Sequence, residues 1–100
     1  MNIQKTNPRG GGREMTIYAT YDELVEAIGE PEDVSDVTNK VDVEWNVEDS
    51  HTGRELAVWN YKNGPNYMGE DGTPPEEIES WSAGGSEELV EDLGLEVESF

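Results

Sequence analysis

The C-terminal part of the chain carries carboxylates without any cations. Residues 76–94, EEIESWSAGGSEELVEDLG, hold seven carboxylates in nineteen positions, and no Lys or Arg follows Lys62. Like charges without counter-charges repel one another and oppose folding. An array of this kind can imitate the phosphates of a nucleic acid and contact a basic surface. We therefore predict that the segment binds a basic partner through its acidic residues Glu76, Glu77, Glu79, Glu87, Glu88, Glu91 and Asp92.

The aromatic pair Trp59 and Tyr61 is a second candidate for binding. Both lie in the strand-like sequence ELAVWNY, where they alternate with Leu56 and Val58. If Leu56 and Val58 face the core, the two aromatics lie on the opposite face of the sheet. An aromatic pair surrounded by carboxylates is a candidate protein-binding patch. Binding of single-stranded nucleic acid is not indicated, because stacking on bases requires a cationic groove alongside.

Residues that could perform catalysis are few. His51 is the only histidine, and it follows Asp49 and Ser50 in a turn-like sequence. A solvent-exposed turn histidine is the simpler interpretation, since the members of a catalytic triad normally meet through tertiary folding. The chain has no Cys, and Glu70-Asp71-Gly72 lacks the alternating acids of an EF-hand loop. We expect no enzymatic activity, no metal centre and no cofactor.

The charge balance limits the possible partners. The formal net charge is −18, of which residues 1–14 contribute +2 and residues 15–100 contribute −20. Such a surface disfavours nucleic acids and anionic membranes. No apolar run is long enough to span a membrane and no secretory signal is evident, so we expect a cytoplasmic protein. Three explanations of the acidity remain open: adaptation to high salt, solubility, and imitation of a nucleic acid.

The segments that must position these residues follow from local patterns. Thr20 and Glu23 form a capping-box pattern before a helix over residues 21–28. Strict alternation predicts a strand over 41–47, which pairs as a hairpin with an interior strand over 55–61. A third strand is expected over 77–83, ended by Gly84-Gly85, and a last helix begins after Ser86. Residues 63–75 are expected to be an irregular loop, and LEVESF is expected to be either a short edge strand or a frayed end.

Together these segments predict an α+β domain over residues 15–100. Its expected architecture is a small antiparallel sheet of three to four strands, packed by an N-terminal and a C-terminal helix. Residues 1–14 have the composition of a disordered tail. Since Met15 follows a glycine-rich stretch whose codons could encode a ribosome-binding site, we also consider Met15 a candidate translation start.

Several short sequences resemble small acidic proteins encoded by bacteriophages and prophages. They include YDELV at 21–25, VWNYKNG at 58–64, YMG at 67–69 and IESWSAGG at 78–85. In those relatives the last stretch has a larger apolar residue where Ala83 stands here. The resemblance implies no particular activity. By analogy of size and charge it suggests inhibitors of host defence, including anti-CRISPR proteins and DNA mimics.

These observations lead to two hypotheses of function. The first is a non-enzymatic, phage-type inhibitor in the host cytoplasm that binds a basic, nucleic-acid-handling host protein, a CRISPR effector being one example. The second is a generic interaction or structural module whose acidity reflects salt adaptation or solubility.

Overall fold

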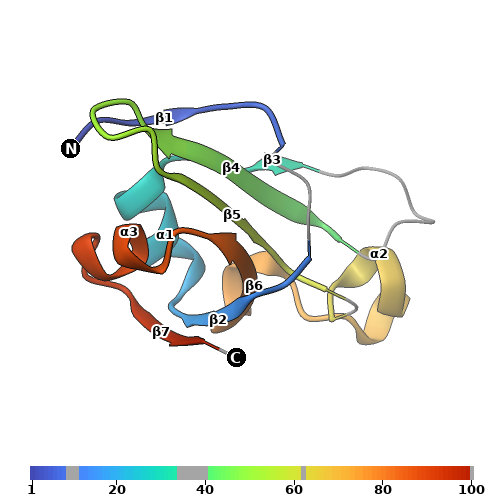
Figure 1. Cartoon of the computed structure of the whole chain (residues 1–100). Helices are drawn as coiled ribbons and strands as arrows, with labels where there is room; N and C mark the ends of the chain where they lie inside the picture. Colours follow the sequence, from blue (N-terminus) through green and yellow to red (C-terminus); the bar gives the residue numbers. More distant parts are fainter. Residues whose placement is uncertain (9–11, 34–40, 62, 100) are drawn as a thin grey trace.

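A computed structural model describes residues 1–8, 12–33, 41–61 and 63–99. In these ranges seven antiparallel strands form one sheet in the order β1-β4-β5-β6-β2-β7, and β3 pairs with β4 (Figure 1). The strands are β1 (Ile3–Lys5), β2 (Met15–Tyr18), β3 (Glu32–Asp33), β4 (Val43–Asp49), β5 (Glu55–Trp59), β6 (Ser80–Gly85) and β7 (Glu96–Ser99). The helices are α1 (Tyr21–Ile28), α2 (Pro65–Met68) and α3 (Glu87–Asp92), with 3₁₀ turns η1 (Gly69–Asp71) and η2 (Pro75–Glu77).

The predicted α+β class, with three or four strands packed by two terminal helices, is wrong. The protein is mostly sheet, and its helices are short, the longest described one having eight residues. The predicted strands correspond to β4, β5, β6 and the edge strand β7. The additional strands β1, β2 and β3 have only two to four residues, too few to show a clear alternation. They become strands because strands distant in the sequence pair with them.

Several local predictions are confirmed. Thr20 caps α1, accepting a hydrogen bond from the Glu23 N–H, while the Glu23 carboxylate accepts one from the Thr20 N–H. The Ser86 side chain caps α3 by accepting from the Leu89 N–H. β4 and β5 form the predicted antiparallel hairpin, and β5 is interior because β6 pairs along its other side. In contrast, Gly84 and Gly85 do not end the third strand, since β6 runs through both.

Gly85 can continue β6 because it has no side chain. Its φ is +116°, and a Cβ at this position would collide with the carbonyl oxygen of Glu55 on the neighbouring strand.

The segment 63–75, expected to be an irregular loop, is more regular than predicted, since it contains α2 and η1. No helix in the described parts of the chain has the length and apolar character needed to cross a membrane.

The hydrophobic core lies on one face of the sheet, which we call the inner face. Trp45 of β4 and Trp81 of β6 are each 1% exposed, and their rings meet edge to face with centroids 5.2 Å apart. Their indole N–H groups donate to the carbonyl oxygens of Gly29 and Ala19, at 2.7 and 2.9 Å. Both α1 and α3 pack on this face (Figure 1), and the helix residues buried there are Leu24, Ile28, Leu89 and Val90.

The N-terminal strand β1 lies inside the segment predicted to be a disordered tail. It pairs with the end of β4, where Ile3 lies opposite Asp49. The buried Asp49 carboxylate accepts hydrogen bonds from the N–H groups of Asn2 and His51 and from the Thr52 hydroxyl. Asp49 therefore ties the first residues of the chain to the β4–β5 turn, an interaction that composition alone does not reveal.

Candidate functional site

The outer face of the sheet, opposite the core, carries an aromatic side chain between carboxylates. The strand registers align one residue from each of six strands across this face, and we call this set the outer row. Because neighbouring strands are about 4.8 Å apart, Glu44 and Glu98 stand about 19 Å from each other, with Trp59 between them. The outer row consists, in order, of Glu32, Glu44, Trp59, Ser82, Thr16 and Glu98.

Trp59 and Tyr61 lie on the outer face, as predicted. Leu56 and Val58 are fully buried in the core, so alternation turns Trp59 outward. Tyr61 is 49% exposed, and Trp59 is half-buried. The residues beside them on the neighbouring strand are small, with Ser82 directly opposite Trp59 and Gly84 opposite Ala57. The small neighbours leave space around the aromatic pair.

That space forms a hollow of about 370 Å³, lined by Trp59, Tyr61, Ser82, Gly12 and Arg13. Gly12 and Arg13 belong to the connection between β1, which pairs with β4, and β2, which lies between β6 and β7. Arg13 also lines a second, smaller hollow of about 130 Å³ together with Tyr61, Ser80 and Ser82. A cationic residue of the chain itself, Arg13, thus borders both hollows.

A buried amide fixes the chain where it leaves β5. Asn60 is 1% exposed, and its side-chain oxygen accepts from the N–H groups of Asp42 and Val43 at 2.8 and 3.1 Å. Its amide nitrogen donates to the side chains of Asp42 and Asn63, both at 3.1 Å. Because Asn60 lies between Trp59 and Tyr61, this network holds the backbone that carries both aromatics.

The acidic residues predicted from the C-terminal segment do not gather around these aromatics. Glu87, Glu88, Glu91 and Asp92 lie on α3, which packs on the inner face. Two of them contact Arg54, whose guanidinium lies 2.9 Å from the Asp92 carboxylate and 4.0 Å from that of Glu88. Part of the charge on α3 is therefore compensated within the protein.

The other acidic residues of the segment lie near α1. Glu76 and Glu77 form part of η2, which contacts α1, and Glu79 follows just before β6. The pKa of the Tyr21 hydroxyl is raised, first by burial and then by the negative charges of Glu30, Glu76, Asp33 and Asp22. The continuous acidic stretch of the sequence is thus divided in space into one group beside α1 and one on α3.

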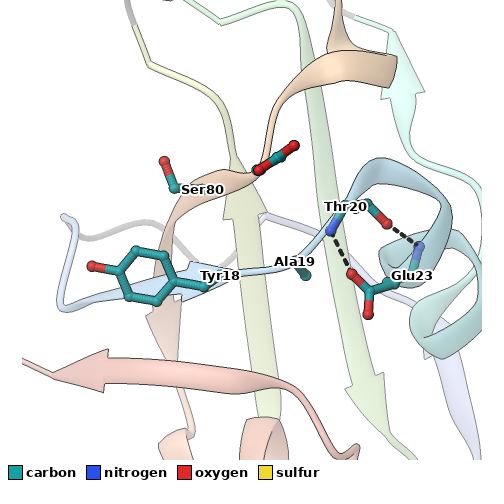
Figure 2. Close-up of a pocket in the computed structure, with 6 residues that line it drawn as sticks. Tyr18, Ala19, Thr20, Glu23 and Ser80 are labelled. Atoms are coloured by element: carbon teal, nitrogen blue, oxygen red, sulfur yellow. Dashed lines mark hydrogen bonds between the residues drawn. The ribbon is translucent and has the colours of Figure 1, made fainter.

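A hollow of about 450 Å³ lies between β2, the start of α1 and the start of β6. Figure 2 shows Tyr18 and Ser80 on one side of it and the capping pair Thr20 and Glu23 on the other. The Glu23 carboxylate and the Thr20 hydroxyl are engaged in the helix cap. Since its central polar groups already have structural partners, this hollow is a weaker candidate than the one at Trp59.

The turn histidine lies next to the buried Asp49 carboxylate. His51 is exposed in the β4–β5 turn, and its backbone N–H donates to the Asp49 carboxylate. Hydrogen bonding, led by the Asn2 N–H, lowers the pKa of Asp49 to about 2, although burial acts in the opposite direction. Asp49 therefore holds the turn together. Among the described residues, no three His, Cys, Asp or Glu side chains converge in a way that would hold a metal ion.

Sequence reasoning missed the carboxylates that flank Trp59. Glu32, Glu44 and Glu98 are far from one another in the chain, and only the strand order places them in one row. For Glu44 the sequence does predict an outward position, because Glu44 alternates with the apolar Val43 and Trp45. Arg13 belongs to the segment predicted to be a tail, and no signal in the sequence predicts that it lines the same hollows as Tyr61.

Comparison with known proteins gives no relative for this chain: no protein-family model matches it, and no curated protein matches it. The resemblance to bacteriophage proteins therefore remains without independent support. The anti-CRISPR and DNA-mimic interpretations, which depended on an analogy of size and charge, also have no support.

Proposed function

We propose that this protein is a non-enzymatic binding module that holds a basic segment of another protein on the outer face of its sheet. The observation that carries the proposal is the outer row, in which Trp59 lies between Glu44 on one side and Glu98 on the other. Partly exposed aromatic side chains are the usual anchors of protein interfaces, and surrounding charges select the partner. The net charge of −18 favours a basic partner.

The spacing of the row fits an extended peptide that crosses the strands. Such a peptide rises about 3.3 Å per residue, so about six residues cover the distance from Glu44 to Glu98. A basic side chain near each end would meet a carboxylate, and a side chain close to the Glu44 end would lie on Trp59, which is one strand from Glu44 and three strands from Glu98. Binding would therefore use two charged contacts and one aromatic contact.

The test is a calorimetric titration with a short peptide that alternates arginine, lysine and glycine. Glu44→Gln combined with Glu98→Gln should weaken binding by about threefold to tenfold, because two rim contacts are lost. The matched control is Glu87→Gln combined with Glu91→Gln, which removes the same charge from α3. At physiological salt, screening over about 8 Å limits the effect of distant charges, so the control should change the affinity less than about twofold.

Equal weakening by the two double variants would contradict the proposal. It would mean that the peptide responds to net charge and has no preferred face.

A second candidate function is that of an interaction or structural module whose acidity is an adaptation to salt. The supporting observation is that exposed carboxylates occur on α1, η1, η2, α3 and β7, so they are not confined to one surface. This candidate predicts unfolding at ordinary ionic strength and a steep rise of the thermal midpoint toward about 1 M salt, where charges are screened within about 3 Å. The binding module should be folded at ordinary salt, with only a moderate rise.

A further inference from the structure

We propose that the hollow beside Trp59 is a binding site for an arginine side chain of the partner, and that Arg13 is its internal competitor. This inference rests on the proposed function and names the chemistry of its aromatic contact. The hollow has two aromatic rings, from Trp59 and Tyr61, and the hydroxyl of Ser82 in its lining. A guanidinium stacks on aromatic faces while it donates hydrogen bonds in its own plane.

The position of Arg13 indicates which cation the hollow suits. Arg13 lines both this hollow and the adjoining one that contains Tyr61, Asn63 and Ser82. Arg13 thus borders the same aromatic and polar residues that a partner's arginine would meet. A partner arginine that enters the hollow must share this space with Arg13 or displace it.

The surrounding charge favours a cation as occupant. Glu44 lies opposite Trp59 in the register of β4 and β5, and Glu98 lies on the same face two strands beyond Ser82. Arginine is expected to bind more strongly than lysine, because its planar, weakly hydrated guanidinium stacks on a ring and loses less hydration there. Ser82, itself nearly buried, offers a hydroxyl oxygen that can accept from it.

The experiment compares two short peptides that differ only in carrying arginines or lysines between glycines. Tryptophan fluorescence reports binding at the site, since Trp45 and Trp81 are buried and Trp59 is the tryptophan that solvent reaches. The arginine peptide should bind the wild-type chain about threefold to tenfold more tightly than the lysine peptide. Calorimetry on the same pairs gives the affinities of variants that lack Trp59.

Variants at Trp59 locate the preference. Trp59→Phe keeps an aromatic face and should keep most of the preference for arginine. Trp59→Leu keeps an apolar side chain of useful size but no ring, and should reduce the preference to less than about twofold. The thermal midpoint of each variant shows whether it is folded.

Arg13→Gln tests the competition. Removal of an internal competitor should tighten binding of the arginine peptide by about twofold to fivefold. The matched control is Lys5→Gln, which removes one exposed cation from β1, where Lys5 lies opposite Val47 on the core side of the sheet. This control should leave the affinity almost unchanged, and a difference between the two variants should persist at raised salt.

The inference is overturned if the two peptides bind equally, if Trp59→Leu keeps the preference for arginine, or if Arg13→Gln and Lys5→Gln have the same effect. Each of these outcomes leaves peptide binding in place, so the proposed function would stand. Failure of the wild-type chain to bind either peptide would instead overturn the proposed function, and this inference with it.

Discussion

The two faces of the sheet use the same residue type in opposite ways. Trp45 and Trp81 on the inner face are 1% exposed, contact each other edge to face, and donate their indole N–H groups to backbone carbonyls. Trp59 lies on the strand between theirs but points outward, with small or charged neighbours. Alternation along β4, β5 and β6 therefore separates the two tryptophans that stabilise the fold from the one that is accessible to a partner.

The largest expected effect comes from replacing the tryptophans of the two faces one at a time. Trp45→Ala leaves a large cavity in the core and should cost about 3–5 kcal/mol of the free energy of unfolding. Since a domain of this size has about 5–15 kcal/mol in total, this variant should be close to unfolding or unfolded. Trp59→Ala should cost about 1 kcal/mol. Urea denaturation measures both, and equal costs would show that the outer tryptophan is also part of the stabilising core.

A second prediction concerns the carboxylate that secures β1 to the inner side of the β4 edge. The pKa of Asp49 is about 2 in the folded protein, below the ordinary value of 3.8, so its contribution to stability is present above about pH 4 and is lost as the pH falls toward 2. Asp49→Asn should lower the thermal midpoint at neutral pH, because the carboxylate no longer accepts from Asn2, His51 and Thr52.

The difference between Asp49→Asn and wild type should then shrink between pH 4 and pH 2. Asp71→Asn, the same chemical change at an exposed position of η1, serves as the control. A constant difference down to pH 2 would mean that the Asp49 charge does not support the fold.

The smallest expected effect on the free energy of unfolding comes from the acidic residues of α3, which lie away from the outer row. In Glu87→Gln with Glu91→Gln, the loss of i,i+4 repulsion is offset by the loss of a favourable negative charge in the first turn of the helix. The free energy of unfolding should stay within about 0.5 kcal/mol of wild type. Asp92→Asn, which removes the ion pair with Arg54, should lower it by up to about 1 kcal/mol. A larger loss in the double variant would show that these glutamates have structural partners.

The elements that the sequence predicts well depend on local interactions. The cap at Thr20, the hairpin of β4 and β5, and the cap at Ser86 each involve residues close together in the chain. The strand β2, with the sequence MTIY, is different. Its four residues carry a weak pattern, and they form a strand because β6 and β7 pair with them on both sides.

The candidate site was predictable in part for the same reason. Alternation along β5 was enough to place Trp59 and Tyr61 outside the core. The sequence predicts that acidic residues 76–92 form the binding surface, because acids that are close together in the sequence are expected to cluster in space. In the structure the row contains Glu44 and Glu98, which only the order of strands brings onto one face.

A ¹⁵N NMR titration of the full chain with the arginine peptide shows which face of the sheet binds the peptide. One spectrum shows the indole N–H signals of Trp45, Trp59 and Trp81 separately. If the outer face binds the basic segment, the Trp59 signal should move together with the amides of Ser82 and Thr16, while the Trp45 and Trp81 signals stay in place. Movement of the α3 amides, Glu87 to Asp92, without movement of Trp59 would contradict the account.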